Sequence, residues 1–257
     1  MLSIAIPSSS LITETDEKIK AYKVGIIARA AAIFRVDEIL IYKDPIKDET
    51  KYIKDILEYL ETPQYLRKYV IPFKDSLRFV GVLPPLAIPS HKTKSLKIGE
   101  IREGAIKYVA PDGTRWVDIG AKTLAPLKSR FQRGARVTVR VCSKNPLRVE
   151  EAKPKEYWGY KVKSMELKEI IRRPNAVLTS RKCEIVKPQK IRRNVTLIFG
   201  NPVDGVFEIA NRLGLKLNIE CWNTIPDQGT RSVRLEESIL ATLALINYFS
   251  SLGGGNE

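Results

Sequence analysis

Residues 195–205 read Val195-Thr-Leu-Ile-Phe199-Gly200-Asn-Pro-Val-Asp-Gly205, an apolar strand that runs directly into a loop containing glycine and proline. Helical spacing resumes after Gly205 and continues through Arg212, so the stretch predicts a strand, a tight loop and a helix. Glycine lets backbone amides approach a ligand closely, and a strand ending at a helix N-terminus is a common small-molecule site. The alternative is turn geometry alone, which is the usual reason for glycine or proline at a strand end.

The common nucleotide-binding fingerprints are missing from this chain. The loop is not G-x-G-x-x-G, no glycine-rich turn follows the first predicted strand, and G-x-x-x-x-G-K-[ST] does not occur. The sequence therefore excludes an ordinary dinucleotide or Rossmann-type methyltransferase site and the P-loop NTPases.

The first 88 residues alternate strand and helix. Strands are predicted at Leu2–Ile6 and Glu38–Tyr42 and helices at Asp16–Phe34 and Lys51–Leu60, while Pro63 limits the next element to a short helix. This order is typical of a parallel sheet with helical crossovers. The pattern resumes after Trp158, with a helix at Met165–Ile171, a strand at Ala176–Thr179 and a last helix at Leu235–Phe249 that Ser232 would cap.

Between residues 89 and 160 the pattern changes to short strands separated by glycines. Strands are predicted at Ala105–Val109, Thr114–Ile119 and Ala135–Cys142, with Gly104, Gly113, Gly120 and Gly134 as the breaks. Within the last of these strands Val137, Val139 and Val141 face one way and Arg136, Thr138 and Arg140 the other. We therefore predict an α/β protein with domain parts at 1–88 and 161–257 and a small antiparallel β-barrel at 89–160.

The positive charge is concentrated in the middle of the chain. The whole sequence carries a net charge of +15, and the blocks 1–88, 89–160, 161–200 and 201–257 carry +1, +9, +8 and −3. This distribution favours a polyanion such as nucleic acid as the partner. A lysine-rich surface of a thermophilic protein is the alternative, but it would pair Lys with Glu throughout.

The cysteines and the single histidine predict neither a disulfide framework nor a metal site. Cys142, Cys183 and Cys221 are widely spaced and odd in number, and His91 is the sole histidine. We expect reduced, buried thiols, a solvated His91 and a cytoplasmic protein without a membrane span, since the most apolar stretch, Ile239–Ile246, is too short. Residues 253–257 are expected to form a disordered tail.

Residues 223–238, Asn-Thr-Ile-Pro-Asp-Gln-Gly-Thr-Arg-Ser-Val-Arg-Leu-Glu-Glu-Ser, place a polar loop before the last helix. Together with TLIFGNPVDG, this segment resembles the signature motifs of the SPOUT class of RNA methyltransferases, and specifically its RNA uridine-N3 methyltransferases. The resemblance extends to four other segments and so covers nearly the whole chain: GIIARAAAIFRVDEI, LRFVGVLPPLAIPSH, EYWGYKV and the strand end Thr179-Ser180-Arg181. That subfamily carries an OB-like barrel inserted within the SPOUT domain.

The resemblance implies a trefoil knot near the C-terminus and S-adenosylmethionine as cofactor. General folding rules make knots rare, so no periodicity could predict one. Three loops are expected to hold the cofactor, with Gly200, Ile225 and Gly229 contributing mainly backbone and Asn223 and Gln228 side-chain hydrogen bonds. The full set of expected cofactor residues is Thr179, Ser180, Arg181, Gly200, Asn201, Gly205, Asn223, Thr224, Ile225, Gln228, Gly229 and Thr230.

Three residues are candidates for the chemistry. Uridine N3 reacts well only as its anion, so the site must favour loss of that proton and stabilise negative charge. Arg234 and Glu237 lie three residues apart at the start of the last helix, where the guanidinium could hold the base or a phosphate and the carboxylate could orient it. Arg29 matches a position where SPOUT enzymes commonly supply an arginine, often across a dimer. Ion pairs within the chain or at an interface are the alternative role for these side chains.

The barrel is expected to grip RNA. The candidate cations are Arg136, Arg140, Lys122, Lys128, Arg130 and Arg133. Aromatic side chains suited to stacking on bases are interleaved with them: Tyr108, Trp116, Phe131, Tyr157 and Trp158. Roughly half of such aromatics belong to the core of any small barrel, so the sequence does not single one out.

These features predict a homodimeric RNA methyltransferase that uses S-adenosylmethionine and no metal and acts on uridine N3, with ribosomal RNA favoured by the resemblance. Two alternatives stay open. One is a non-catalytic RNA-binding or ribosome-assembly protein with the same fold, against which the intact loops at 200–205 and 223–237 argue. The other is an enzyme of the class with a different target atom, such as ribose O2′ or guanine N1.

Overall fold

The structure, a computed structural model, describes residues 1–253 and divides them into two compact units. Unit 1 consists of Met1–Glu58, Ser76–Pro85 and the chain from Tyr160 onward, and unit 2 of Tyr59–Asp75 and Leu86–Gly159. Unit 2 thus includes a helical segment in addition to the stretch predicted for the barrel. The Tyr65 hydroxyl in that segment donates to the Glu103 carbonyl at 2.9 Å, which ties the segment to a barrel strand.

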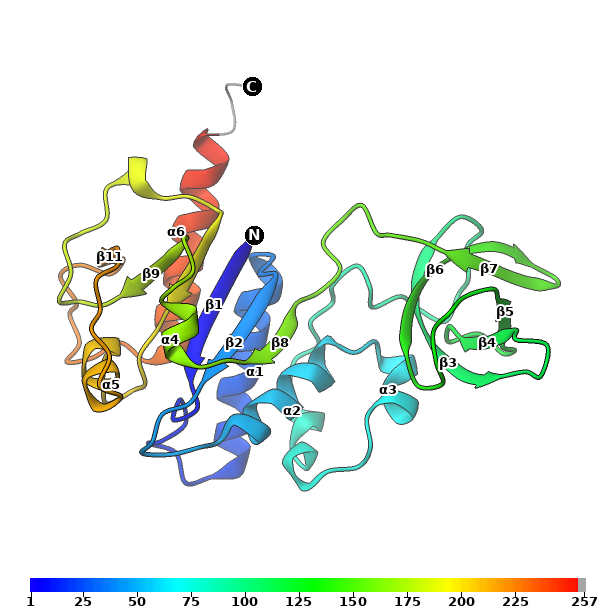
Figure 1. The fold of residues 1–257 in the computed structure, drawn as a ribbon, viewed down its shortest axis with the longest axis horizontal. Helices are drawn as coiled ribbons and strands as arrows, with labels where there is room; N and C mark the ends of the chain where they lie inside the picture. Colours follow the sequence, from blue (N-terminus) through cyan, green and yellow to red (C-terminus); the bar gives the residue numbers. More distant parts are fainter. Residues whose placement is uncertain (254–257) are drawn as a thin grey trace. The chain divides into compact units, whose positions relative to one another are not determined.

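Unit 1 is built on a parallel sheet with the spatial order β11-β9-β10-β1-β2-β8 (Figure 1). Its strands are β1 (Leu2–Pro7), β2 (Glu38–Tyr42), β8 (Lys161–Ser164), β9 (Ala176–Thr179), β10 (Val195–Ile198) and β11 (Cys221–Trp222). Parallel strands present their carboxyl ends at one edge, so the loops that follow β9, β10 and β1 lie together there. The predicted parallel α/β sheet is confirmed.

Helices cover both faces of this sheet. They are α1 (Glu17–Ile33), α2 (Thr50–Glu61), α4 (Leu167–Ile170), α5 (Val206–Arg212) and α6 (Leu235–Gly253). Leu167 of α4 and Ile209 of α5 pack in one core cluster with Ala5, Leu40 and Ile198 of the strands. Because side chains alternate along a strand, their neighbours, buried Ile4, Ile39 and Leu197, point to the other face. Figure 1 shows α1 and α6 side by side on the sheet.

Unit 2 contains α3 (Gln64–Val70) and an antiparallel sheet with the order β5-β4-β3-β6-β7 that curls into a nearly closed barrel. Its strands are β3 (Ile101–Val109), β4 (Arg115–Asp118), β5 (Ala125–Leu127), β6 (Arg136–Lys144) and β7 (Leu147–Glu151). The predicted alternation in β6 is confirmed, since Val137, Val139 and Val141 lie in the barrel core. Gly104 does not break the strand as predicted but lies inside β3, where a Cβ would come within 2.5 Å of Val117.

The thiols differ from the prediction. Cys183 and Cys221 are joined by a disulfide with Cα atoms 5.7 Å apart, and Cys142 is free and exposed. The sequence separation of 38 residues concealed this pairing. It arises because β11 pairs with β9 in parallel, which brings Cys221 beside the segment that leaves β9.

The C-terminal helix is longer than predicted. It continues past Phe249 to Gly253, so the first residue of the expected tail is helical, and residues 254–257 lie outside the described part of the chain. Short 3₁₀ turns occur at Asp75–Leu77, Val80–Val82 and Pro188–Lys190. Among residues 1–253, no helix combines the length and the apolarity that crossing a bilayer requires.

Candidate functional site

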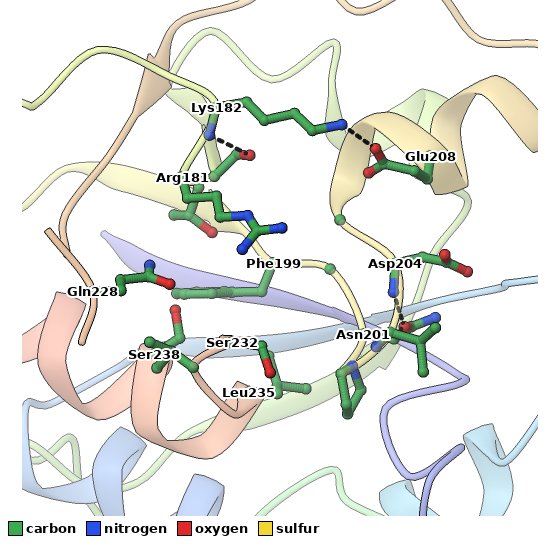
Figure 2. A pocket seen from close by; sticks show the side chains of 17 residues that line it. Arg181, Lys182, Phe199, Asn201, Asp204, Glu208, Gln228, Ser232, Leu235 and Ser238 are labelled. Atoms are coloured by element: carbon green, nitrogen blue, oxygen red, sulfur yellow. Dashed lines mark hydrogen bonds and ion pairs between the residues drawn. The ribbon is translucent and has the colours of Figure 1, made fainter. Parts of the chain in front are cut away.

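A cavity of about 300 Å³ opens at the carboxyl ends of β9 and β10 in unit 1 (Figure 2). Three chain segments form it: the end of β9 with the residues after it, the loop between β10 and α5, and the segment leading into α6. The lining residues are Thr179, Ser180, Arg181, Lys182, Phe199, Gly200, Asn201, Pro202, Val203, Asp204, Gly205, Glu208, Gln228, Ser232, Val233, Leu235 and Ser238. The loop quoted first from the sequence therefore does form one wall of a cavity.

The strand ends that support the cavity are held by buried hydrogen bonds. The Thr179 hydroxyl donates to the Ile198 carbonyl at 2.9 Å, which joins the ends of β9 and β10. The Phe199 carbonyl accepts from the Tyr42 hydroxyl at 2.6 Å. Burial raises the pKa of Tyr42 well above its ordinary value, so this phenol stays a donor.

Gly200 allows the loop after β10 to fold back on itself. A Cβ at this position would lie 2.5 Å from the Asp204 carbonyl oxygen and 2.7 Å from the Gly205 Cα. Both neighbours are backbone, so neither can move aside without opening the loop. Glycine is required here by this close approach.

Asn201 fixes the shape of the same loop. Its side-chain oxygen accepts the backbone N–H groups of Val203 and Asp204 at 2.7 and 2.6 Å. Its side-chain nitrogen donates to the Ser9 hydroxyl at 2.9 Å and to the Asp44 carboxylate at 3.3 Å. Asp44, which is fully buried, thus anchors the loop to the end of β2.

Charged side chains line the rim of the cavity. Figure 2 shows the Arg181 side chain extending into it, where its guanidinium donates to the Arg231 carbonyl at 2.9 Å. Lys182 forms an ion pair with Glu208 of α5. The hydrogen bond from Lys182 is the main cause of a lowered pKa of Glu208 and outweighs the opposing effect of burial. The rim therefore carries both cationic donors and an ionised carboxylate.

The loop at 223–230 supports the cavity more than it lines it. Of its predicted cofactor residues only Gln228 is a lining residue, and its amide donates to the Ile225 carbonyl at 3.2 Å. Asn223 accepts the Ile225 N–H at 3.1 Å through its side chain. The Thr224 and Thr242 hydroxyls are 2.7 Å apart, and the Thr230 hydroxyl donates to the Ser232 carbonyl at 3.1 Å. Gly229 is exposed and has nothing near its Cβ position.

The helix α6 starts at Leu235 as predicted, but the residue that caps it differs from the prediction. The helix begins at Leu235, so Arg234 rather than Ser232 is the residue before it, and the Ser238 N–H donates to the Arg234 carbonyl at 2.8 Å. The Glu237 carboxylate accepts the Arg234 backbone N–H at 3.0 Å, which is half of a capping box. The three-residue spacing therefore has a structural role, and Glu237 binds the Arg234 backbone rather than its guanidinium.

Arg234 and Arg29 lie outside the lining of the cavity. Arg234 is exposed, and both of its chain neighbours, Val233 and Leu235, line the cavity. The Arg29 guanidinium donates to the Pro85 carbonyl at 3.1 Å. Their catalytic roles, and that of Glu237, stay predictions.

Several residues that line or support the cavity were not predicted from the sequence. Phe199, Lys182, Glu208 and Ser238 line it, and Asp44 holds its loop. A signal for Asp44 was available, because it follows the central strand Glu38–Tyr42 and so lies at the carboxyl edge of the sheet. The remaining four depend on the packing of three segments that are far apart in sequence.

In unit 2 the candidate RNA-binding cations divide into two groups. Arg136 is partly exposed and forms ion pairs with Glu61 at 2.6 Å and Glu103 at 3.3 Å, whose carboxylates are nearly buried. Arg140 pairs with Glu150 at 3.1 Å, and both are exposed. The other four candidates are exposed, and no ion pair within residues 1–253 engages them: Lys122, Lys128, Arg130 and Arg133.

His91 also differs from the prediction of a solvated linker residue. Its ring nitrogen Nε2 lies 2.8 Å from the Glu61 carbonyl oxygen in unit 2. Burial lowers the pKa of His91, and nearby Arg67 and Arg136 act in the same direction. Among the described residues, no group of three or more His, Cys, Asp or Glu side chains is arranged to hold a metal ion.

Comparison with known proteins identifies the family. Residues 1–246 match the family model described as "Putative RNA methyltransferase". An uncharacterised protein of Halobacterium salinarum is 32% identical over 94% of this chain and 96% of its own length. The human 28S rRNA (uridine-N(3))-methyltransferase is 30% identical over 95% of this chain and 77% of its own length.

A solved RNA 2′-O ribose methyltransferase structure aligns with 97% of this chain and 56% of its own, with a TM-score of 0.39 and 12% sequence identity. The match of the family model and of the two relatives extends over both units.

Proposed function

Because the chain belongs to this family of RNA methyltransferases, we propose that it transfers a methyl group from S-adenosylmethionine to N3 of a uridine in structured RNA, with ribosomal RNA as the favoured substrate. The cavity at the ends of β9 and β10 carries the proposal, since the three segments that line it lie in stretches where the sequence resembles the signature motifs of the class. The function for which the human relative is named supports the choice of uridine N3.

The residues of the cavity fit the proposed cofactor. S-adenosylmethionine has a flat aromatic base, a ribose diol and an amino-acid end with one carboxylate and one ammonium group. Phe199, Val233 and Leu235 offer apolar surface, and the folded loop at Gly200 exposes backbone in a place that a Cβ would fill. Arg181 offers a donor for a carboxylate, and Asp204 and Glu208 offer acceptors for hydroxyl or ammonium groups. When bound, the cofactor supplies an electrophilic methyl group.

The chain's own residues then have to manage the proton and the charge of the target base. Methyl transfer is an in-line displacement, so positioning is the main requirement. We assign stabilisation of the uridine anion to Arg234, whose exposed side chain follows cavity-lining Val233 and precedes cavity-lining Leu235. Glu237 has a positioning role in this proposal, because its carboxylate fixes the Arg234 backbone.

A trefoil knot is part of the proposal for unit 1. The support is the pairing of the two segments that would form it. Ile185, in the loop after β9, makes a parallel bridge to Asn223, the residue after β11. The Asn223 N–H donates to the Glu184 carbonyl at 2.9 Å and the Val186 N–H to the Asn223 carbonyl at 3.1 Å. The chain leaving β11 therefore runs against this loop before it enters α6.

A homodimer is also proposed, from apolar side chains on the outer faces of α1 and α6. Six of these side chains are more than 40% exposed: Ile19, Tyr22 and Ile33 on α1, and Leu240, Tyr248 and Leu252 on α6. Their helical spacing places them on one face of each helix, and the two helices are neighbours. Arg29 shares that face of α1 by its spacing of seven from Tyr22. Light scattering should give twice the 29.1 kDa chain mass, and Tyr22→Glu should shift it to the monomer.

Two measurements test the function. Calorimetry should show S-adenosylhomocysteine binding at about −8 kcal/mol, or micromolar affinity. Gly200→Ala should abolish this binding because its Cβ meets backbone at 2.5 Å, whereas Gly81→Ala, with nothing within 4 Å, should bind like the parent. Nucleoside mass spectrometry of RNA from cells with and without the gene should show loss of 3-methyluridine.

The outcomes separate the alternatives. If RNA from cells without the gene lacks a ribose 2′-O-methyl group or 1-methylguanosine instead, the target atom is ribose O2′ or guanine N1. The rest of the proposal would then be unchanged. No cofactor binding together with no lost methyl group would instead make the protein a non-catalytic RNA-binding member of the family.

A further inference from the structure

Three ring-bearing side chains lie in register across adjacent strands on the outside of the barrel. Tyr108 of β3 pairs with Trp116 of β4, and Trp116 pairs with Pro126 of β5. The next residues along β4 and β5, Val117 and Leu127, point into the barrel core, so the paired rings must point out. We call Tyr108, Trp116 and Pro126 the ring row.

An irregularity in β3 brings Tyr108 into this row. Ile106 pairs with Val117 and lies in the core, and strict alternation would send Tyr108 inward as well. The register shifts between Ile106 and Tyr108, so Tyr108 pairs with Trp116 instead. Bulges commonly re-aim a side chain in this way at functional surfaces. As a result the Tyr108 and Trp116 rings are 6.0 Å apart between centroids and within 17° of parallel.

The ring row is accessible and has cations beside it. Tyr108 is 45% exposed, and Trp116 and Pro126 are partly exposed. Lys128, two residues after Pro126, and Arg148 of β7 line an adjoining cavity of about 410 Å³ together with Pro126 and Thr114. No ion pair engages Lys128 or Arg148 in the part of the chain that the structure describes.

Trp158, another candidate aromatic of unit 2, makes its contact in a different place. The Trp158 indole N–H donates to the Glu103 carboxylate, inside the cluster that holds Arg136. The ring row is therefore the aromatic surface of unit 2 in which rings of neighbouring strands are aligned and exposed. Within a segment whose net charge is +9, a polyanion with exposed rings of its own is the complementary partner.

From these observations we infer that the ring row is a stacking platform for unpaired bases of a single-stranded RNA segment, with Lys128 and Arg148 contacting its phosphates. The inference rests on the proposed function, because it takes RNA as the substrate. Base stacking on aromatic side chains tolerates any base, whereas the cations follow the backbone. The platform would thus select unpaired RNA over duplex without reading its sequence.

The test measures binding of a fluorescein-labelled oligouridylate about twelve nucleotides long by anisotropy, with an RNA duplex of equal length for comparison. The single strand should bind more tightly than the duplex. Tyr108→Ala and Trp116→Ala should each weaken single-strand binding by about 5- to 100-fold, the effect of losing one stacked base. Tyr108→Phe and Trp116→Phe should bind like the parent because the ring is kept. Phe73→Ala is the matched control, since Phe73 is an exposed aromatic of unit 2 outside the row.

Salt dependence provides a second readout that a folding defect would not reproduce. Stacking releases no counterions, so the alanine variants should keep the parent's slope of log affinity against log salt. Lys128→Gln and Arg148→Gln should each lower that slope by about 0.7. Unchanged affinity in both alanine variants, or equal loss in the alanine and phenylalanine variants, would overturn the inference. Equal affinity for the single strand and the duplex would also overturn it.

The cofactor serves to separate this inference from the proposed function. Binding of S-adenosylhomocysteine by the same variants should equal that of the parent, because all residues lining the cofactor cavity belong to unit 1. If the parent binds the oligouridylate but not S-adenosylhomocysteine, the proposed reaction is wrong, but the inference that the ring row stacks on RNA bases is unaffected. If the parent binds S-adenosylhomocysteine and the alanine variants bind RNA as tightly as the parent does, the inference about the ring row is wrong, but the proposed reaction is unaffected.

Discussion

Asp44 and Asn201 are 157 residues apart, and the side-chain amide of Asn201 donates to the buried Asp44 carboxylate at 3.3 Å. This contact joins the end of β2 to the loop that follows β10. The same Asp44 carboxylate is 3.3 Å from the Arg212 guanidinium of α5, which also pairs with Asp204 at 3.1 Å. The loop around Gly200 is therefore held from both ends before any ligand arrives.

Removing the Asn201 side chain should loosen this loop. Asn201→Ala loses the acceptor for two backbone N–H groups, so we expect about 1 to 3 kcal/mol lower stability and at least tenfold weaker binding of S-adenosylhomocysteine. Urea denaturation and calorimetry measure the two effects. Asn211→Ala, an exposed position on α5, is the control and should change neither. Parent-like cofactor affinity in Asn201→Ala would show that the loop does not contact the cofactor.

Substitutions at the start of α6 distinguish catalysis from capping. Arg234→Lys keeps the charge but loses the planar set of donors, so single-turnover methylation should fall by about 100-fold or more, with cofactor binding unchanged. Its rate should rise with pH as the unaided imide ionises. If Arg234→Lys reacts like the parent at neutral pH, Arg29 becomes the leading candidate.

Glu237 provides the complementary experiment. Glu237→Gln keeps an oxygen that can accept the Arg234 N–H, so the capping role predicts activity close to that of the parent. Glu237→Ala removes the acceptor and should cost about 1 kcal/mol of stability. A large loss of activity in Glu237→Gln with unchanged stability would instead support a direct catalytic role.

The sequence predicted the elements with a clear apolar pattern and failed where contacts between distant segments decide the structure. Strand Glu38–Tyr42 and strand Ala176–Thr179 match the structure, because each is a short apolar run with clear breaks. The edge strands Lys161–Ser164 and Cys221–Trp222 escaped prediction, since the first is mostly polar and the second has two residues. The hydrophobic pattern of these two segments is the same as that expected for a loop.

The candidate site shows the same division. The Gly200 loop was predictable because strand, glycine and helix follow one another in sequence. The Asp44 anchor was missed although Asp44 follows the strand Glu38–Tyr42, because the loop that it holds lies 157 residues away in the sequence. Alternation correctly gave the face of β6 on which Arg136 lies, but it could not give the partner of Arg136 there, because Glu61 is 75 residues away in the sequence.

The Arg136 cluster should make Arg136 important for stability rather than for binding RNA. Arg136→Gln removes the cation that forms ion pairs with the nearly buried carboxylates of Glu61 and Glu103, which should cost about 3 kcal/mol. Arg140→Gln is the matched control, because that pair is exposed and should be worth less than about 1 kcal/mol. Urea denaturation followed by tryptophan fluorescence, to which Trp116 and Trp158 of unit 2 contribute, measures both. Equal stabilities, with a reduced slope of log affinity against log salt for RNA binding in Arg136→Gln, would instead support the prediction from the sequence that Arg136 contacts RNA.

Reduction of the disulfide should destabilise unit 1. Cys183 and Cys221 close a loop of 38 residues, and loop-closure entropy assigns about 4 kcal/mol to such a bond. Cys183→Ser should therefore lower the free energy of unfolding and make it insensitive to dithiothreitol. Cys142→Ser should keep the parent's sensitivity, since Cys142 is free. A parent protein whose stability does not respond to dithiothreitol would contradict the bond's contribution.

His91 makes the stability of the protein depend on pH in a window where few other side chains titrate. Burial lowers its pKa below the ordinary 6.5, so the unfolded chain binds a proton at His91 more readily than the folded chain. Stability should be complete above about pH 6.5 and fall as the pH drops toward the folded-state pKa. His91→Gln should flatten this dependence below about pH 6.5.

The single imidazole allows a direct measurement of the cause. Because His91 is the sole histidine of the chain, one pair of ring proton resonances reports its titration by NMR. We expect the folded-state midpoint below 6.5 and the urea-unfolded midpoint near 6.5. The Glu61 carbonyl, which binds the ring at 2.8 Å, favours the protonated form and limits the shift. A folded midpoint at or above the unfolded one would mean that this hydrogen bond outweighs burial, and acid would then stabilise the barrel unit instead of weakening it.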